Sequence, residues 1–328
     1  MPSAPRRTLL RALARTGLLA AAFCAPALAL AAWPAQPVRV VVPYSPGGSS
    51  DLIARALAVE LGRELGQSVV VDNKPGASAM LGAELVARAA PDGYTLLLAD
   101  MPHVINASLY KTRYDPIKDF TPLGLVGSTP LVLVVNPKLP VKTLKDYIDL
   151  AKSRPGKLNL ASGGNGTTTH LMGELMKQQL GLFITHIPYK GSGQAMGDVL
   201  SGQIEGTFAT APGAVGHVKS GTLRALAVTS AAPTPALPGV PTFESSGVKG
   251  LTVTHWFGLL APAKLAPEAD AALQQALTRA LAAPALQQRL TAMAVDLTPG
   301  TPAQFVQRME ADSARWARVI QDAKIKVD

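Results

Sequence analysis

The stretch from Val41 to Arg55, VVPYSPGGSSDLIAR, joins an apolar segment, a glycine-rich turn and the start of an amphipathic pattern. Residues 38–42 are almost continuously apolar, which is typical of a strand buried on both faces. Beyond the turn, a helix with one buried face is predicted from apolar residues at every fourth position, Ile53, Leu57, Leu61 and Leu65. Ser49 or Ser50 is expected to cap this helix, with Asp51 in its first turn.

The same plan continues and is then repeated further along the chain. Strands predicted at 69–71 and 94–99, with a helix at 79–89 between them, complete a β-α-β-α-β unit. A second unit follows in the same order, with strands at 157–161, 183–187 and 204–209 and helices at 170–180 and 194–201. The pattern predicts an α/β protein in which each unit forms a doubly wound sheet.

The two units match in loop type as well as in element order. VVPYSPGGSSDLIARAL aligns with NLASGGNGTTTHLMGEL, and NKPGASAMLGAEL aligns with PYKGSGQAMGDVL. Because the identity is low, the match indicates a repeated architecture without proving a duplication.

Two further apolar strands, predicted at 130–136 and 253–260, would connect the units as crossovers. The simplest assembly inserts the second unit into the first, with domain I at 32–134 and 256–328 and domain II at 135–255. Helices at the C-terminal end would cover domain I, and the last begins with the capping box Thr301-Pro-Ala-Gln304. The residues expected in its core face are Phe305, Met309, Trp316 and Ile320. Domains joined by two strands enclose a cleft that can close by hinge bending.

Residues 1–31 have the pattern of an export signal. Four arginines and no acid precede an alanine- and leucine-rich run that is too short for a good membrane span. Arg6-Arg7 loosely matches a twin-arginine motif, so either the Sec or the Tat route is possible. Cleavage is expected between Ala29 and Ala32. It would remove Cys24, the single cysteine, and so exclude disulfides and cysteine-based chemistry from the mature chain.

The charge pattern argues against nucleic-acid binding. Without the four arginines of the signal, the formal net charge falls from +9 to +5. The remaining basic residues are scattered and are not interleaved with aromatic side chains. A mildly basic exported protein is at most weakly biased toward anionic ligands.

The two glycine-rich loops are the candidate site. Ligands of open α/β sheets lie beyond the carboxyl ends of the strands, so Pro43–Asp51 is expected to face Ser162–His170 across the cleft. Each loop offers glycines, hydroxyls and the free N–H groups of a helix start, which favour an anion. Two such loops suit a small molecule with two negative ends, such as a dicarboxylate. Neither a phosphate loop G-x-x-x-x-G-K-[ST] nor a dinucleotide fingerprint is present.

The sequence gives less support to a catalytic function. There is no G-x-S-x-G elbow and no H-E-x-x-H. None of the five histidines has metal-ligand spacing with another, and only His103 and His170 are expected at the edges of the cleft. Lys190 is the one cationic side chain near a candidate loop. An exported α/β hydrolase or transferase remains the alternative class.

The chain resembles the Bug-type periplasmic solute-binding proteins of tripartite tricarboxylate transporters over essentially its whole mature length. The resembling stretches include PVRVVVPYSPGGSSDLIARALA, VVVDNKPGASAMLGAELVARAAPDGYTLLLAD, YDPIKDFTPLGLV, GNGTTTHLMGEL, HIPYKGSGQAMGDVLSGQIEGTF and WFGLLAPAKLAP. The resemblance implies a periplasmic monomer with a two-domain Venus flytrap fold, which carries a carboxylic acid to a membrane permease and needs no cofactor or metal. The family's ligands include citrate, amino-acid dicarboxylates and aromatic acids such as terephthalate. The alternative function is a ligand-sensing protein that acts on a sensor kinase instead of a permease.

The resemblance also implies a set of ligand contacts. The loop around Pro46-Gly47-Gly48 would hold one carboxylate, and the loop around Asn165-Gly166-Thr167-Thr168 would hold the rest of the ligand. The complete predicted set is Tyr44, Ser45, Pro46, Gly47, Gly48, Ser49, Asp51, Met101, His103, Gly164, Asn165, Gly166, Thr167, Thr168, Tyr189, Phe208 and Ala209. The chain departs from the family pattern at Asp100-Met-Pro-His103 and at Ala209-Thr210, where ligand specificity is expected.

Overall fold

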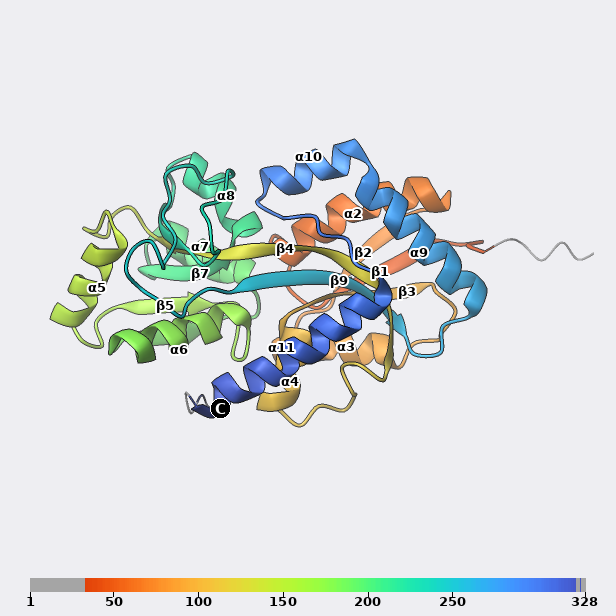
Figure 1. Ribbon diagram of the computed structural model, residues 1–328, viewed down its shortest axis with the longest axis horizontal. Coiled ribbons are helices and arrows are strands. Elements are labelled where there is room, and N and C mark those ends of the chain that lie inside the picture. The colour runs from red at the N-terminus through yellow and green to blue at the C-terminus, as the bar shows by residue number, and fades with distance from the viewer. Residues whose placement is uncertain (1–32, 323–324, 326–328) are drawn as a thin grey trace, which may run out of the picture.

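A computed structural model describes residues 33–322 and residue 325 (Figure 1). The predicted export signal at 1–31, with Cys24, lies outside the described residues. Within the described part of the chain, no helix combines the length and the apolar character that a membrane crossing requires.

The described strands form one mixed sheet in the order β2-β1-β3-β9-β4-β7-β5-β6, with β8 paired to β4. Their bounds are β1 Val38–Val42, β2 Val69–Asn73, β3 Thr95–Asp100, β4 Phe120–Val135, β5 Asn159–Ser162, β6 Thr185–Pro188, β7 Gly206–Thr210, β8 Arg224–Val228 and β9 Thr254–Pro262.

Helices pack on the faces of this sheet (Figure 1). Their bounds are α2 Ser49–Leu65, the 3₁₀ turn η2 Ala77–Ala79, α3 Met80–Ala87, α4 Pro102–Leu109, α5 Leu144–Ser153, α6 Thr168–Leu180, α7 Ser192–Ser201, α8 Ala211–Lys219, α9 Pro267–Ala282, α10 Pro284–Ala292 and α11 Pro302–Asp322.

The two predicted units fold with the same local topology. β1 pairs in parallel with β2 and β3, and β5 pairs in parallel with β6 and β7. An antiparallel strand closes each unit, β9 beside β3 and β4 beside β7. The turns after β2 and β6 also match, because Gly76 and Gly191 both adopt positive φ, at 139° and 152°. The α/β class and the repeat predicted from the sequence are confirmed.

The strand β4 belongs to both halves of the molecule. Residues 120–130 pair with β9, whereas residues 131–135 pair with β7, and 132–135 also with β8. Figure 1 shows β4 and β9 running side by side between the two groups of helices. We call β2, β1, β3 and β9 the first strand group, and β7, β5, β6 and β8 the second. The domain boundaries at 134/135 and 255/256 remain a prediction.

Several boundaries differ from the prediction. The strand expected from residue 183 begins at Thr185, and the helix expected at 79–89 is a 3₁₀ turn followed by α3. The N-cap of α2 is Gly48, without a side-chain cap, so neither Ser49 nor Ser50 caps it. Their hydroxyls are otherwise engaged, Ser49 accepting from Thr210 and Ser50 donating to Asp100. The helices α4, α5 and α8 and the first half of β4 were not predicted.

The last helix, α11, packs against α4 and β4 and reaches β9 through Phe305 and Asp312. Phe305, Met309, Trp316 and Ile320 are all buried. A side chain at Gly258 of β9 would meet the Phe305 ring, since an added Cβ there would lie 2.1 Å from it. The buried Asp312 accepts hydrogen bonds from Trp256 Nε1 (2.9 Å) and from Arg308 Nε (2.6 Å), which ties α11 to β9.

The capping box of α11 is present, and it yields a test of local stability. The Thr301 N–H donates to Gln304 Oε1 (2.8 Å), and the Gln304 N–H donates to Thr301 Oγ1 (3.3 Å). Thr301→Ala is expected to lower the free energy of unfolding by about 1 kcal/mol, since it removes one partner of the pair. Urea denaturation measures the change. Thr301→Ser keeps the hydroxyl, so equal losses in both variants would contradict the capping role.

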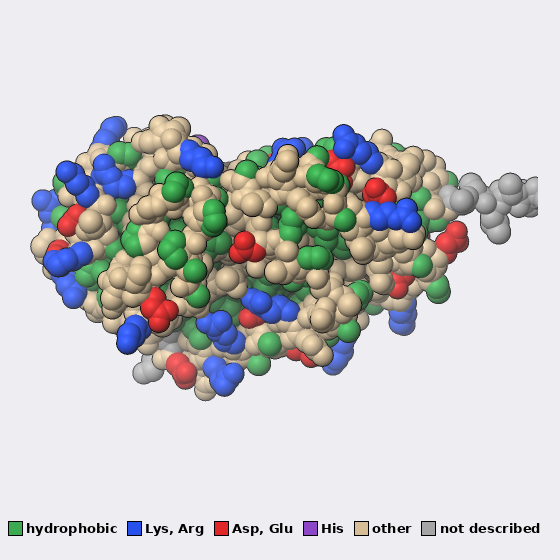
Figure 2. All heavy atoms as spheres, turned by 45° about the horizontal axis from the view of Figure 1, so that its top comes forward, with side chains coloured by type: hydrophobic (Ala, Val, Ile, Leu, Met, Phe, Trp, Pro, Cys, Tyr) green, Lys and Arg blue, Asp and Glu red, His purple; other side chains and the backbone are tan. Residues whose placement is uncertain are grey.

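Charged side chains are distributed unevenly over the surface. On the face in Figure 2, Lys and Arg side chains are interspersed with acidic, apolar and neutral surface, and they are densest at the end that carries α5.

Candidate functional site

The two glycine-rich loops both line the cleft between the strand groups, and each is bonded to a further segment of the opposite group. The first loop comprises residues 43–48 and the second comprises residues 163–167. Ser45 Oγ donates to the Lys190 carbonyl (3.1 Å), and Ser78 Oγ donates to the Asn165 carbonyl (2.5 Å). Tyr110 donates to the same carbonyl (3.2 Å), and Thr210 donates to Ser49. These contacts join segments of opposite strand groups, so the cleft is closed in this conformation.

An inner cavity of about 30 Å³ lies between the loops. Helix starts converge on it, through Gly48 and Ser49 of α2, Pro102 of α4, Thr168 of α6, Ser192 of α7 and Thr210 of α8. Helix N-termini carry unpaired N–H groups and a partial positive charge. Among the described residues that line this cavity there is no Lys or Arg. The polar part of its lining consists of backbone at helix starts, hydroxyl groups, Asp100 and His255.

A buried polar group forms one wall of the inner cavity. Asp100 accepts hydrogen bonds from the Tyr44 hydroxyl (2.9 Å) and from Ser50 Oγ (3.3 Å). His255 lies between this carboxylate and the opposite strand group, with Nε2 3.5 Å from Asp100 Oδ2 and Nδ1 3.0 Å from Thr168 Oγ1. Burial, and then the charge of Asp100, raise the pKa of Tyr44 well above its usual value, so the phenol stays protonated and donates.

An outer cavity of about 830 Å³ adjoins the inner one and shares Tyr44 and Gly163 with it. Its walls come from both strand groups, namely from 43–44, 76–80, Tyr110, 163–165, 188–190 and Gln194. No Asp or Glu is among these described lining residues, and Lys190 is their single cation. A volume of this order can hold a small organic molecule.

Asp51 fixes the shape of the first loop through hydrogen bonds. Its Oδ2 accepts the Gly47 N–H (3.0 Å) and Arg55 Nε (3.0 Å), while Oδ1 accepts the Asn73 amide (3.1 Å). Burial alone would raise the pKa of Asp51, but the hydrogen bonds from Arg55, Gly47 and Asn73 outweigh it and lower the pKa. The carboxylate is thus an internal anion at the start of α2.

Three N–H groups of the second loop donate to neutral side chains. The Gly163 N–H donates to Thr169 Oγ1 (3.0 Å), and the Gly164 N–H donates to Ser162 Oγ (3.1 Å). The Gly166 N–H donates to His170 Nδ1 (3.1 Å). Thr167 is the N-cap of α6, and its hydroxyl accepts from the His170 N–H. No acidic residue lies in the first turn of α6, in contrast to α2.

The structure brings most of the predicted contact residues to the cleft. The inner cavity is lined by Tyr44, Gly48, Ser49, Thr167 and Thr168, and the outer one by Tyr44, Gly164, Asn165 and Tyr189. A third cavity of about 180 Å³ is lined in part by Pro46, Gly47, Gly48, Ser49 and Ala209. Ser45, Asp51 and Gly166 contribute through the hydrogen bonds and close approaches that shape the loops.

Met101, His103 and Phe208 lie in the core and line none of these three cavities. Met101 Sδ accepts from Trp316 Nε1 (3.1 Å). His103 Nε2 lies 2.8 Å from the Pro116 carbonyl, and burial lowers its pKa to about 4. Phe208 stacks on Phe243. The start of α4 directly after β3 turns the first two of these side chains inward.

Part of the outer wall was not predicted from the sequence, namely Gly76–Met80 with Tyr110 and Gln194. Ala77, Ser78 and Ala79 all adopt positive φ, at 46°, 53° and 75°. Three consecutive non-glycine residues in this region are strained, and such strain concentrates at ligand sites. The alignment of NKPGASAMLGAEL with PYKGSGQAMGDVL was the available signal, because the second turn of each unit reaches the cavity.

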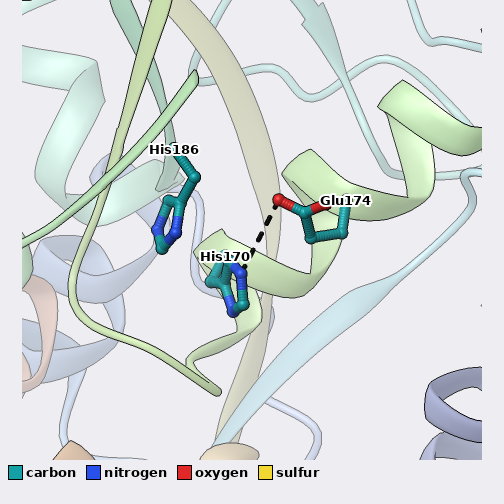
Figure 3. Close-up of side chains that lie close together, drawn as sticks. All are labelled: His170, Glu174 and His186. Atoms are coloured by element: carbon teal, nitrogen blue, oxygen red, sulfur yellow. Dashed lines mark ion pairs between the residues drawn. The ribbon is translucent and has the colours of Figure 1, made fainter. Parts of the chain in front are cut away.

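His170, Glu174 and His186 form a cluster that the sequence spacing did not reveal (Figure 3). One ligand atom from each lies within 4.8 Å of the others. The hydrogen bond from Gly166 to His170 Nδ1 leaves the ring proton on Nε2, which faces Glu174 Oε1 at 3.7 Å. Lys177 Nζ lies 2.6 Å from the same oxygen. A protonated Nε2 and a lysine-paired carboxylate are poor metal ligands, so the cluster fits a hydrogen-bonded network better.

Comparisons with known proteins agree on one class. The sequence model described as "Tripartite tricarboxylate transporter family receptor" matches residues 53–325. The chain is 37% identical to protein BugT of Bordetella pertussis over 298 residues, or 90% of this chain and 91% of the relative.

Solved structures give the same result. Periplasmic binding protein BugD has a TM-score of 0.87 at 34% identity, covering 90% of this chain and 99% of that one. A protein of R. palustris solved with adipate gives 0.86 at 34% identity, with 90% and 99% covered. MatC of Rhodopseudomonas palustris, solved with bound malate, gives 0.84 at 31% identity, with 88% and 100% covered.

Proposed function

Because the chain belongs to the family of tripartite tricarboxylate transporter receptors, we propose that it captures a small organic acid in its cleft and passes it to a transporter permease. The acid is a di- or tricarboxylate or an aromatic carboxylate. The protein acts in the periplasm as a monomer and does so without catalysis, cofactor or metal.

The convergence of helix starts on the inner cavity carries this proposal. Several N-termini face one small volume without a lysine or arginine in its described lining. That arrangement holds an anion through dipoles and hydrogen bonds, which form and break without a covalent step. The two similar proteins solved with adipate and malate hold dicarboxylic acids, which supports a carboxylate here.

The proposed ligand spans both cavities. One carboxylate occupies the inner cavity between Gly48–Ser49 and Thr167–Thr168, and the rest of the acid extends into the outer cavity past Tyr44 and Tyr189. The inner volume is small in the closed conformation, so the ligand enters an open form and the loops then close over it.

A thermal-shift screen of carboxylic acids tests the proposal, from C4 diacids through adipate to aromatic acids. A ligand that binds only the folded protein raises the melting temperature with its concentration. Small-angle scattering with the best acid should show compaction on loading. Absence of any shift across the panel, or turnover of a carboxylate ester, would contradict the proposal.

Lys190 is expected to distinguish diacids from monoacids. It lines the outer cavity, and among the described residues no carboxylate lies within ion-pair distance of it. Lys190→Gln should weaken adipate binding about two- to fivefold, the range for an exposed ion pair, and leave hexanoate binding unchanged. Calorimetry measures both. Lys157→Gln, on an exposed lysine away from the cavities, is the control, and equal losses for both acids would refute the pairing.

A further inference from the structure

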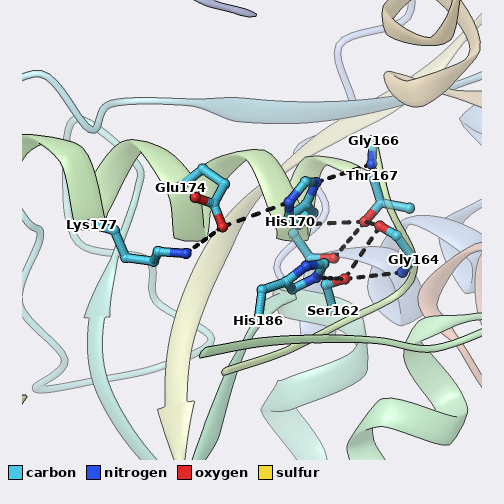
Figure 4. Close-up of polar contacts among 9 residues, drawn as sticks. Ser162, Gly164, Gly166, Thr167, His170, Glu174, Lys177 and His186 are labelled. Carbon is cyan, nitrogen blue, oxygen red and sulfur yellow. Dashed lines mark hydrogen bonds and ion pairs between the residues drawn. The ribbon is translucent and has the colours of Figure 1, made fainter. Parts of the chain in front are cut away.

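Two histidines contact the second loop and the residue that precedes it. His170 of α6 and His186 of β6 stack with ring centroids 4.0 Å apart and planes 22° apart. Figure 4 shows both rings joined to the loop by hydrogen bonds. The Gly166 N–H donates to His170 Nδ1 (3.1 Å), and Ser162 Oγ lies 2.6 Å from His186 Nε2. The stack therefore contacts the loop at two points that flank Gly164 and Asn165, which line the outer cavity.

The bond from Gly166 requires a neutral His170 ring. A backbone N–H can only donate, so His170 Nδ1 must present a lone pair. Ser162 Oγ accepts the Gly164 N–H (3.1 Å), and its own proton has two acceptors within reach, the Gly164 carbonyl (3.3 Å) and His186 Nε2 (2.6 Å). Protonation of His170 would place two donors opposite each other at Gly166, and protonation of both rings would stack two cations.

The charges around the pair come from one helix. Glu174 and Lys177 of α6 are the titratable groups that act on the two rings, and the facing β5 and second loop supply hydroxyls and N–H groups. Burial is the main cause that lowers the pKa of His170, opposed by Glu174 and assisted by Lys177. Burial, then His170 and Lys177, lower the pKa of His186 to about 3. Both rings are therefore neutral near pH 7.

We propose that His170 is a positioning residue for ligand binding: its neutral Nδ1 holds the second loop in the shape that receives the acid, and its protonation releases that loop. The proposal rests on the proposed function for its effect on affinity. Its effect on the loop itself stands without a ligand.

Protonation of His170 and binding of the ligand then oppose each other. Since the loaded form requires neutral His170, affinity is full above the pKa of this group in the free protein. It falls as the pH drops through that pKa, by up to about tenfold for each pH unit below it.

The first test needs no ligand. Nitrogen-15 NMR of the histidine rings should show His170 with a bare Nδ1 and a proton on Nε2. The Gly166 amide should lose its protection from hydrogen exchange when this ring is protonated. A proton on Nδ1 near pH 7, or protection that persists when the ring is charged, would overturn the inference. A zinc-dependent rise in melting temperature that His170→Asn abolishes would also overturn it, because it would show a metal-binding nitrogen.

The second test uses adipate as the probe and two variants. His170→Asn places an amide oxygen where Nδ1 lies and does not titrate, so it should bind adipate as the wild type does at pH 7 and lose less affinity in acid, where only the protonation of adipate itself remains. His170→Leu lacks the acceptor and should bind about tenfold more weakly at every pH. An unchanged acid loss in His170→Asn would refute the proposal. If the wild type binds none of the screened acids, the proposed function fails, and the NMR result alone decides the role in the loop.

Discussion

Gly48→Val is expected to lower ligand affinity on the order of 100-fold while the protein remains folded. A Cβ at Gly48 would lie 3.0 Å from Ser192 Oγ and 3.6 Å from the Gly193 nitrogen, both on α7 of the second strand group. A Cβ alone could be accommodated by rotation of the serine hydroxyl, but the two methyl groups of valine extend further toward the α7 backbone. The clash arises only when the cleft is closed. It therefore penalises the loaded form and leaves the open form unchanged.

Two companion variants test this explanation. Gly193→Val introduces the same obstruction from the opposite side, because a Cβ there would lie 2.8 Å from the Pro46 carbonyl. Gly216→Val is the control, since a Cβ at Gly216 of α8 meets nothing within 4 Å. Calorimetry measures affinity, and scattering measures compaction. Normal affinity in Gly48→Val would refute the proposed site, and full compaction of Gly193→Val with ligand would refute the closure model.

Asp51→Ala is expected to lower the free energy of unfolding by about 2–3 kcal/mol and also to weaken binding. Asp51 is 3% exposed. Removal of its carboxylate takes away the oxygens that accept from the Gly47 N–H and the Asn73 amide. The Arg55 pair adds less, because the arginine side chain is half exposed and screened by water. The first loop then loses the group that fixes its turn.

The same carboxylate gives a signed dependence on pH. The pKa of Asp51 in the folded protein is lower than in the unfolded chain. Its stabilisation is therefore complete above the ordinary Asp range, near pH 4, and is lost as the pH falls through the folded pKa. Asp51→Asn keeps an acceptor for Gly47 but cannot ionise. Urea denaturation should show a stability gap between wild type and Asp51→Asn at pH 7 that narrows at pH 3, and a constant gap would contradict this account.

The parts of the fold that were predictable from the sequence are those with local causes. A buried strand, a glycine turn and a helix start follow one another within VVPYSPGGSSDLIAR, so the loop and its place at the end of β1 could be read directly. The repeat then located the second loop. The capping box of α11 was equally local, because its two partners lie three residues apart.

The predictions that failed concern side chains whose contacts come from distant segments of the chain. Ser49 and Ser50 were good cap candidates, but Thr210 and Asp100 from distant segments engage their hydroxyls. Met101 and His103 were expected to face the ligand, but α4 turns them toward Trp316 and Pro116. Pro102 at the first turn of α4 was a usable signal for that helix.

Other features carried no signal at all. Alanine and serine at 77–79 give no warning of positive φ, which is more usual for glycine and asparagine. His170 and His186 meet only because β5 and β6 pair in parallel, beside the helix that joins them.

The inequality between the two helix starts gives the cleft a direction. Asp51 already places a negative charge at the N-terminus of α2, whereas the first turn of α6 contains no acid. The α6 side of the inner cavity is likewise lined without a carboxylate, by Gly163 and residues 167–169, whereas Asp100 contacts Ser50 of α2. The carboxylate proposed for the inner cavity is therefore expected to lie closer to Thr168 than to Gly48. In the proposed site, an acid with one ionised and one neutral end would then place the ionised end in the inner cavity and the neutral end in the outer one, so its two ends would not be interchangeable.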